Sequence, residues 1–167
     1  MAFQSFYKTD IVPKLQSEFG YKNIHAVPTV TSVTLNVGLG AGMKDAKYIE
    51  TAEKTLTKIT GQKPVPTKAR MSISTFKIRE GNIVGMKVTL RGKRMWDFLE
   101  KLIKISLPRV RDFRGLSVNA FDGQWNYSIG FKEHIAFPEI RSDEIELIHG
   151  LQVTIATSAK TNEESKS

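Results

Sequence analysis

The clearest strand pattern in this 167-residue chain lies at Val84–Arg91, which reads VGMKVTLR. Apolar and polar residues alternate there with the period of two that is typical of a strand with one buried face. The polar face carries Lys87, Thr89 and Arg91. Side chains two positions apart on a strand lie roughly 7 Å from one another, which is close to the phosphate spacing along a nucleic-acid strand. The pattern therefore predicts a sheet with a cationic face suited to a polyanion.

Basic residues gather around this strand. Fourteen of the 25 Lys and Arg residues, but only four of the 17 acidic residues, lie in Gly61–Gly115, so this segment carries a net charge of +10. The remaining 11 basic and 13 acidic residues nearly cancel. Such a concentration of cations favours a nucleic-acid partner. The alternative is a basic face that only keeps the protein in solution.

Three stretches of the chain show helical spacing of apolar residues. They cover residues 3–19, 46–59 and 94–107, and the last of them has Ile103 on its core stripe. Pro13 interrupts the first pattern, so it predicts either a kink or the start of a second short helix.

Further strands are predicted on both sides of the basic segment. Period-two alternation covers residues 29–37, 125–132 and 151–155, and prolines place the extended residues 64–67 at a sheet edge. The first of these strands has an uncharged polar face that includes Asn36. Hydroxyls and amides on such a face can hydrogen-bond to the sugars and phosphates of RNA.

Residues 68–82, which read KARMSISTFKIREGN, predict a basic loop. The loop holds the cations Lys68, Arg70, Lys77 and Arg79 and the apolar residues Met71, Ile73 and Phe76. A basic loop with apolar residues at its tip can insert against another macromolecule, which makes it a candidate second contact. The alternative is a loop that folds down over its own core.

A glycine-rich turn at Gly38–Gly42 is the one feature that favours an enzyme. The dinucleotide-binding fingerprint requires glycine where Met43 stands, and the P-loop requires Lys-Ser or Lys-Thr where Lys44-Asp45 stands. Asp45 is better interpreted as the N-cap of the following helix. A nucleotide-dependent enzyme that uses this turn as a phosphate cradle nevertheless stays open as an alternative function.

Composition excludes several other kinds of site. The absence of cysteine excludes disulfides, thiolate metal sites and cysteine nucleophiles. The three histidines have no metal-ligand spacing, and no nucleophile elbow or paired-carboxylate motif is present. We therefore expect no catalytic residue, no metal and no cofactor. No secretory signal or apolar run of roughly 18 residues stands out, which predicts a soluble intracellular protein without a membrane partner.

Several sequence blocks resemble one known family. They are FGYKN (19–23), TGQKP (60–64), FKIREG (76–81), KVTLRG (87–92), LPRVRDFRG (107–115) and FPEI (137–140). In this order they resemble the bacterial-type ribosomal proteins L-five of the large subunit, over nearly the whole chain. The resemblance implies an α+β fold in which helices pack on one side of an antiparallel sheet. We expect a single compact RNA-binding domain over residues 1–159, followed by a polar, disordered tail over residues 160–167.

The resemblance also implies a role in translation without enzymatic activity. It implies a cytoplasmic structural protein of the ribosome that holds 5S ribosomal RNA in the central protuberance of the large subunit. The implied 5S contacts are Asn36, Gln62 and Thr89, with Lys63, Lys87 and Arg91 beside them. Further implied partners are 23S ribosomal RNA and neighbouring proteins of the central protuberance. An RNA-binding adaptor outside the ribosome is the other alternative.

Two more contacts follow from the resemblance. The basic loop at about 68–82 corresponds to a mobile loop that touches the P-site tRNA, and its implied contact residues are Lys68, Arg70, Met71, Ser72, Phe76, Lys77 and Arg79. A region within about Arg109–Glu146 corresponds to the intersubunit bridge to protein S-thirteen of the small-subunit head, with Arg109, Arg111 and Arg114 as candidate contacts. The chain departs from the family at Gly123–Tyr127, where GQWNY replaces a frequent GRGNY and removes one cation. Many members continue into an apolar C-terminal helix, whereas this sequence ends in the polar residues Glu163–Ser167.

Overall fold

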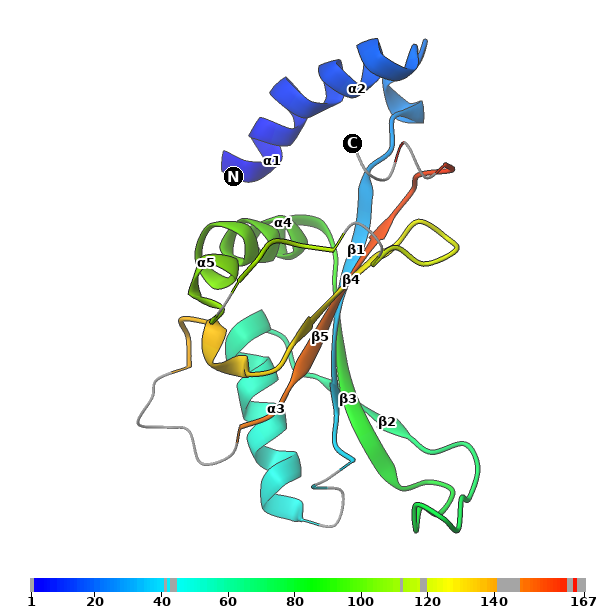
Figure 1. Cartoon of the computed structure of the whole chain (residues 1–167), viewed down its shortest axis with the longest axis vertical. Helices are drawn as coiled ribbons and strands as arrows, with labels where there is room; N and C mark the ends of the chain where they lie inside the picture. The colour runs from blue at the N-terminus through cyan, green and yellow to red at the C-terminus, as the bar shows by residue number, and fades with distance from the viewer. Residues whose placement is uncertain are drawn as a thin grey trace. The chain divides into compact units, whose positions relative to one another are not determined.

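The computed structural model describes residues 2–40, 42, 45–111, 113–117, 120–140, 148–161 and 164. Within this part of the chain, five strands form one antiparallel sheet in the order β2-β3-β1-β5-β4, accompanied by helices (Figure 1). The predicted α+β class is therefore confirmed. The strands are β1 (Val30–Gly38), β2 (Val65–Lys68), β3 (Ile83–Leu90), β4 (Tyr127–Phe131) and β5 (Leu151–Thr157).

Helices occupy the segments in which helical spacing predicts them. They are α1 (Ala2–Phe6), α2 (Val12–Phe19), α3 (Ala46–Thr60), α4 (Gly92–Lys101) and α5 (Leu107–Arg109). Two π-helical turns, Tyr7–Ile11 and Leu102–Ser106, join α1 to α2 and α4 to α5. Short 3₁₀ turns lie at Ile24–Ala26 and His134–Ala136.

The chain divides into two compact units. The first unit comprises Met1–Val33, Leu90–Ile129 and Thr154–Ser167, and the second comprises Thr34–Thr89 and Gly130–Val153. The expectation of one RNA-binding domain over residues 1–159 stays a prediction. So does the disordered tail, much of which lies outside the described residues.

Hydrogen bonds give the direction of the strands in the second unit. In the second unit Thr34 lies beside Thr89 with 3.4 Å between their hydroxyl oxygens, and the Leu39 N–H donates to the Val84 carbonyl at 3.0 Å. Partner numbers fall along β3 as they rise along β1, so these strands are antiparallel. β2 also pairs antiparallel with β3, at the sheet edge that the prolines predict.

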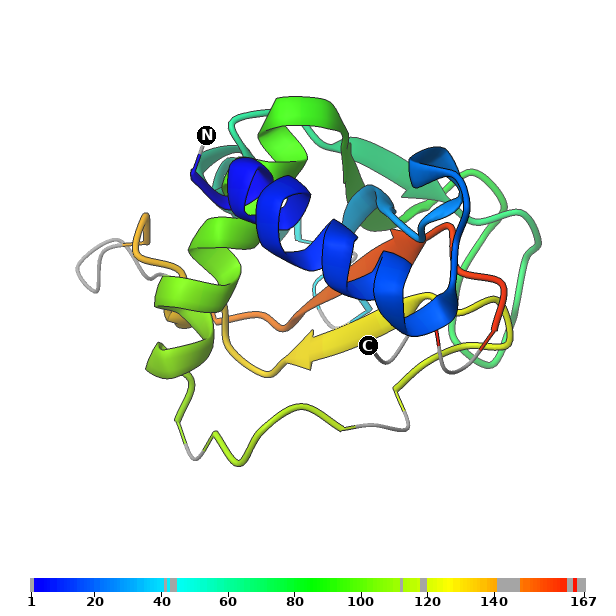
Figure 2. The same cartoon turned by 90° about the horizontal axis from the view of Figure 1, so that it is seen from above.

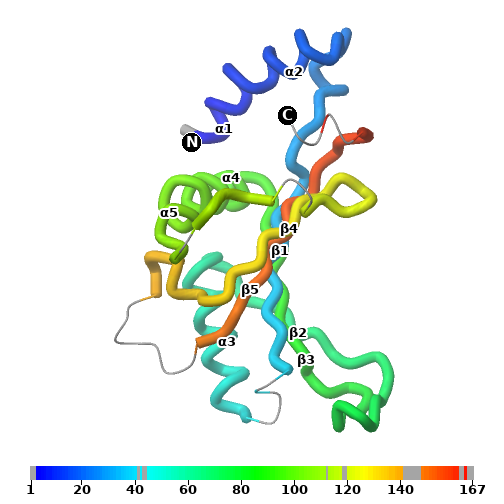
Figure 3. The backbone as a smooth tube through the Cα atoms, viewed as in Figure 1, coloured from blue at the N-terminus to red at the C-terminus, as the bar shows by residue number. Residues whose placement is uncertain are grey.

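The second unit buries the apolar faces of β1 and β3 and one face of α3. Leu35, Val37 and Val88 are at most 2% exposed, as is Leu56 on α3. Figure 3 shows α3 running alongside these strands. The helix begins where the sequence predicts, because the Asp45 carboxylate accepts the Lys47 N–H at 2.9 Å.

α3 ends at Gly61, which has a φ of 66°. This left-handed conformation costs glycine little because it has no side chain, so the helix can end here, one residue beyond the predicted stretch 46–59.

The N-terminal helix packs through aromatic residues in the first unit. α1, the π-helical turn and α2 form one continuous helical segment (Figures 1 and 2). Phe3 and Tyr7 place their rings 6.2 and 5.0 Å from the ring of Trp96 on α4. Trp96 is 9% exposed, so its ring packs inside the first unit.

Both π-helical turns come shortly before a proline, Pro13 or Pro108. A proline ring clashes with the carbonyl four residues earlier, and a π-helical turn moves that carbonyl outward. The wider turn thus allows Pro13 to lie within a continuous helical segment. The second turn also corrects a prediction: Ile103 is 47% exposed instead of lying in the core, because the wider turn breaks the 3.6-residue period.

A pair of buried histidines lies in the second unit. The rings of His134 and His149 stack with 4.2 Å between their centroids, and both side chains are at most 4% exposed. Burial lowers the pKa of His134, and burial together with the neighbouring His134 lowers the pKa of His149. Both rings are therefore neutral at pH 7 and take up a proton only in acid.

We expect this pair to make folding sensitive to mild acid. The unfolded chain takes up protons near the ordinary histidine pKa of 6.5, whereas the folded pair takes them up at lower pH. The unfolded state therefore binds more protons below pH 6.5, and the free energy of unfolding falls as the pH drops from 7.5 through this value. Urea unfolding across this range measures the loss. His149→Phe should reduce this loss of stability, whereas His25→Gln at an exposed position should leave the loss unchanged. Equal pH dependence of the free energy of unfolding in the unsubstituted protein and both variants would contradict the assignment.

A second prediction concerns the close packing of Gly85 in β3. A Cβ there would lie 2.9 Å from both the Thr67 hydroxyl and the Val37 carbonyl oxygen. Gly85→Ala should therefore lower the free energy of unfolding by about 1–3 kcal/mol. Gly130→Ala in β4 is the matched control, since a Cβ there meets no atom within 4 Å, and it should change stability by less than about 0.5 kcal/mol. Denaturant unfolding of the two variants and of the unsubstituted protein measures both changes in stability.

Candidate nucleic-acid interface

The polar faces of β1 and β3 meet in the second unit. The Thr34–Thr89 contact sets the register, and since side chains alternate with a period of two, Asn36 lies opposite Lys87 on the same face. Asn36 and Lys87 are exposed, and Thr89 is half-buried. The sheet therefore brings together three of the predicted contact residues, with an amide, an ammonium group and a hydroxyl on one surface.

β2 extends this surface. Val65 pairs with Lys87, and Thr67 pairs with Gly85. Val65 is 58% exposed, so an apolar side chain borders the lysine. The period of two already places Thr34 on the polar face with Asn36. Sequence reasoning missed Val65 and Thr67 as members of the surface, because only the observed pairing places β2.

Gln62 is held in place by main-chain and side-chain contacts. Its Nε2 donates to the Thr89 carbonyl at 3.4 Å, and its backbone N–H donates to the Thr60 hydroxyl at 3.2 Å. The Thr60 hydroxyl also contacts the Leu56 carbonyl at 2.7 Å, so the end of α3 anchors this residue. The structure therefore brings Gln62 next to Thr89.

Lys63 lies beside Gln62 and forms an ion pair with Glu53 of α3. The Lys63 Nζ lies 3.5 Å from the Glu53 Oε1, and the lysine side chain is 82% exposed. An exposed pair of this kind contributes little to stability. The ammonium group remains accessible to an anionic partner.

Arg91 belongs to the first unit. It directly follows β3, has an extended backbone, and precedes the first residue of α4. Its side chain is exposed. The other five predicted 5S contacts lie in the second unit, so Arg91 is described apart from them.

The predicted basic loop is an extension of the β2–β3 hairpin. The Ala69 N–H donates to the Asn82 carbonyl at 2.8 Å, and Ile73 and Ile78 exchange backbone hydrogen bonds of 2.9 and 3.1 Å. Figure 3 shows this hairpin continuing beyond the ends of β2 and β3. The turn at its tip places Lys77 in the left-handed region, with a φ of 54°.

The side chains of this hairpin are exposed. Met71 and Phe76 are 70% and 68% exposed, and Ile73 is 41% exposed. All four predicted cations of the loop, Lys68, Arg70, Lys77 and Arg79, are exposed as well. The alternative in which the loop covers its own core is therefore wrong. Ser72 has a structural contact, because its hydroxyl accepts the Glu80 N–H at 2.9 Å.

The third predicted region lies in the first unit. Arg109 ends α5, and Arg111 and Arg114 follow in a segment without regular structure; all three are exposed. Phe113 and Leu116 beside them are 43% and 45% exposed. Asp112 and residues 141–146 of the predicted bridge region lie outside the described residues.

The turn that departs from the family pattern contains Trp125 at a φ of 64°. This conformation favours glycine, the residue that the family often has there. Hydrogen bonds hold the turn: the Asp122 carboxylate accepts the backbone N–H groups of Gln124 and Asn126 at 2.8 Å, and the Trp125 carbonyl accepts the Thr157 hydroxyl at 2.8 Å.

Three main-chain N–H groups in and next to the glycine-rich turn after β1 donate to carbonyls of the chain itself. The Leu39 N–H donates to Val84, the Gly42 N–H to Leu39 and the Asp45 N–H to Gly42, at 2.9–3.0 Å. A Cβ at Gly42 would collide with the ring of Tyr48, so packing accounts for this glycine. These donors do not form a phosphate cradle. Met43 and Lys44, where the nucleotide motifs fail in sequence, lie outside the described residues.

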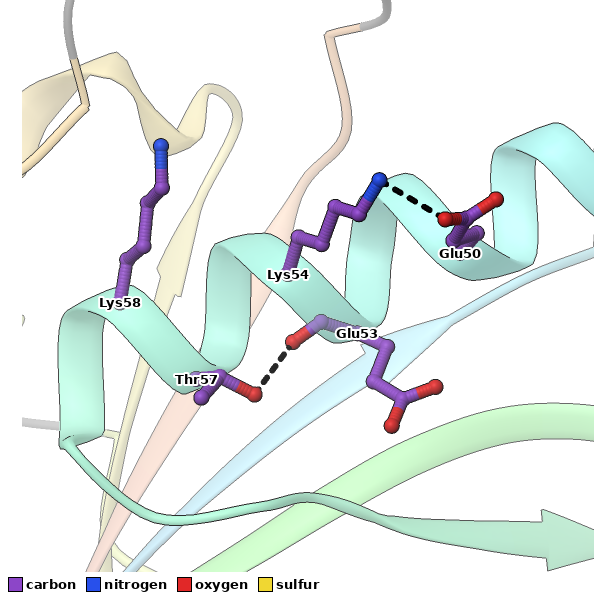
Figure 4. A pocket seen from close by; sticks show the side chains of 5 residues that line it. All are labelled: Glu50, Glu53, Lys54, Thr57 and Lys58. Atoms are coloured by element: carbon purple, nitrogen blue, oxygen red, sulfur yellow. Dashed lines mark hydrogen bonds and ion pairs between the residues drawn. The ribbon is translucent and has the colours of Figure 1, made fainter.

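The outer face of α3 carries a shallow pocket with charges of both signs. Lys54 pairs with Glu50 at 2.7 Å, the Thr57 hydroxyl donates to the Glu53 carbonyl at 2.7 Å, and the Glu53 carboxylate points away from Glu50 and Lys54 (Figure 4). Matched charges do not favour a phosphate ligand.

The described residues form neither a metal site nor a membrane-spanning helix. They contain no group of three or more acidic or histidine side chains that could hold a metal ion. Among the helices of the described chain, none has the length and apolarity needed to cross a bilayer.

Comparison with known proteins gives a consistent result. The family described as ribosomal protein L5 matches residues 23–79, and the family described as the C-terminus of the ribosomal L5 proteins matches residues 83–167. A protein of Cupriavidus taiwanensis named large ribosomal subunit protein uL5 is 55% identical over 163 residues, which cover 98% of this chain and 91% of the relative.

Two further relatives carry the same name. The protein of Colwellia psychrerythraea is 56% identical over 158 residues, or 95% of this chain and 87% of the relative. That of Burkholderia mallei is 55% identical over 164 residues, or 98% of this chain and 92% of the relative. With both family matches and this identity over nearly its full length, the chain belongs to the ribosomal protein L5 family.

Proposed function

We propose that this chain is a constituent of the large ribosomal subunit and binds 5S ribosomal RNA through the polar face of β1, β3 and the start of β2. The observation that carries the proposal is the register that puts Asn36 opposite Lys87 and Thr34 beside Thr89. The proposed contacts are Asn36, Gln62, Lys63, Lys87 and Thr89, with Arg91 after them in sequence.

Membership of this family identifies a structural ribosomal protein and not an enzyme. The alternative of a nucleotide-dependent enzyme at Gly38–Gly42 is therefore wrong. The internal hydrogen bonds of that turn agree with this conclusion.

The chemistry of the surface favours recognition of RNA shape. Amide and hydroxyl groups can exchange hydrogen bonds with 2′-hydroxyls, while the lysine ammonium groups neutralise phosphates. The described side chains of this face include no aromatic ring on which a base could stack. A folded RNA with an accessible minor groove is therefore the partner that this surface suits best.

Two further contacts belong to the proposal. The exposed β2–β3 hairpin, with its four cations and the apolar Met71 and Phe76, is suited to touch the P-site tRNA. The segment with Arg109, Arg111 and Arg114 is suited to an intersubunit bridge with protein S-thirteen of the small-subunit head. The central protuberance also supplies 23S ribosomal RNA and neighbouring proteins as partners.

Binding of purified protein to 5S ribosomal RNA tests the main proposal. A structured RNA of similar length serves as the competitor, and both are titrated at low and high salt. Preference for 5S RNA that persists at high salt is the expected result, because shape recognition adds to charge neutralisation. Equal binding that collapses with salt would contradict it. Co-sedimentation with large subunits in high salt then distinguishes a stable constituent from an adaptor outside the ribosome.

Lys87→Ala should weaken 5S RNA binding and reduce the slope of log affinity against log salt by about one phosphate contact. Thr89→Val should weaken binding at every salt concentration and leave the slope unchanged, since a hydroxyl carries no charge. The matched control is Lys58→Ala on the outer face of α3, which should preserve both affinity and slope. Unchanged binding by the Lys87 and Thr89 variants would contradict the proposed surface.

The hairpin can be tested separately. Replacement of Lys68, Arg70, Lys77 and Arg79 by Ala should leave 5S RNA binding within about twofold of the original but weaken P-site tRNA binding to assembled ribosomes. A control protein in which Lys14, Lys22, Lys54 and Lys58 are replaced loses the same charge elsewhere and should retain tRNA binding. Loss of 5S binding in the hairpin variant would mean that the hairpin contacts a different RNA.

A further inference from the structure

A groove of about 590 Å³ opens in the first unit. Its walls come from the N-terminal helical segment, the residues before and at the start of β1, and the start of α4. This size lies in the range of protein sites that enclose a ligand or several side chains. No residue proposed above to contact RNA lines it.

The groove is largely apolar. Its lining includes Val12, Ile24, Val30 and Met95, and Ile24 is 63% exposed. An exposed aliphatic side chain next to other apolar side chains marks a surface that is stabilised when another apolar group covers it. The lining therefore favours an occupant with an apolar side chain.

The aromatic residues of the groove do not offer free faces to a base. Trp96 is 9% exposed because Phe3 and Tyr7 pack against it, and the Tyr7 hydroxyl donates to the Pro28 carbonyl. Stacking on nucleic-acid bases requires an accessible ring face. This arrangement favours a protein occupant over an RNA base.

Charge adds a second requirement. Lys8 and His25 line the groove, and none of its described lining residues is acidic. Gly92, which also lines it, is flanked in sequence by Arg91 and Lys93, both exposed. A carboxylate on the occupant would complement Lys8, and Lys93 adds positive charge next to the groove in sequence.

We propose that this groove binds a segment of a neighbouring ribosomal protein that inserts an apolar side chain beside Ile24 and places a carboxylate against Lys8. The inference rests on the proposed function, because it requires the chain to sit in the large subunit. It assigns a protein-binding role to the N-terminal helical segment, separate from the RNA-binding face of the second unit.

Zero-length cross-linking of isolated large subunits tests the charge requirement. A carbodiimide joins an amine to a carboxylate in contact, so Lys8 should become linked to an Asp or Glu of another protein, identified by mass spectrometry. Lys8→Arg keeps the charge but removes the amine, and it should abolish this one product. Absence of a Lys8 product in the unsubstituted protein, or a link to this chain's own tail, would overturn the proposal.

A photoreactive residue at position 24 tests the apolar contact. Irradiated large subunits should contain a cross-link from p-benzoylphenylalanine at Ile24 to the same protein segment that reacts with Lys8. The probe at Ile103, which is 47% exposed in the same unit and does not line the groove, is the control and should not capture that segment. A cross-link to RNA, to a second copy of this chain, or to nothing would overturn the inference. Absence of the unsubstituted chain from large subunits would instead refute the proposed function.

Discussion

The register of β3 between β2 and β1 is the constraint on which the second unit depends. Because side chains alternate with a period of two, a slip of one residue would turn Lys87 and Thr89 toward the core and expose Met86 and Val88. The close contact at Gly85 helps to fix the register, since a Cβ at this position would lie 2.9 Å from atoms of both neighbouring strands. Core packing and the polar surface are thus two results of one alignment.

Much of this arrangement could be predicted from local sequence signals. Alternation at Val84–Arg91 gave β3, Asp45 gave the start of α3, and the prolines before Lys68 gave the edge strand. Each of these signals acts through residues a few positions apart, because caps, turns and strand periodicity are local properties. These signals also predicted the polar strand faces that hold Asn36 and Thr89, whereas the α+β class was implied by the resemblance to the ribosomal L-five family.

Features that depend on distant residues could not be predicted in this way. Nothing in the local pattern shows that Val65 lies beside Lys87, or that His134 stacks on His149. The exposure of Ile103 was also missed, because a π-helical turn shifts the phase of the helix and periodicity assumes a constant 3.6 residues per turn. The basic loop was recognised by composition, but its pairing as a hairpin required the backbone hydrogen bonds between Ile73 and Ile78.

The ion pair between Lys63 and Glu53 gives this lysine a counterion from its own chain. In the proposed complex an RNA phosphate would take the place of the Glu53 carboxylate, so binding at Lys63 would give up an ion pair that a lysine without a partner does not have. The displaced carboxylate also repels any polyanion that does not hold the phosphate firmly against Lys63. The Glu53 carboxylate therefore lowers the affinity of Lys63 for arbitrary polyanions. An RNA that Gln62 and Thr89 already hold in position is less affected.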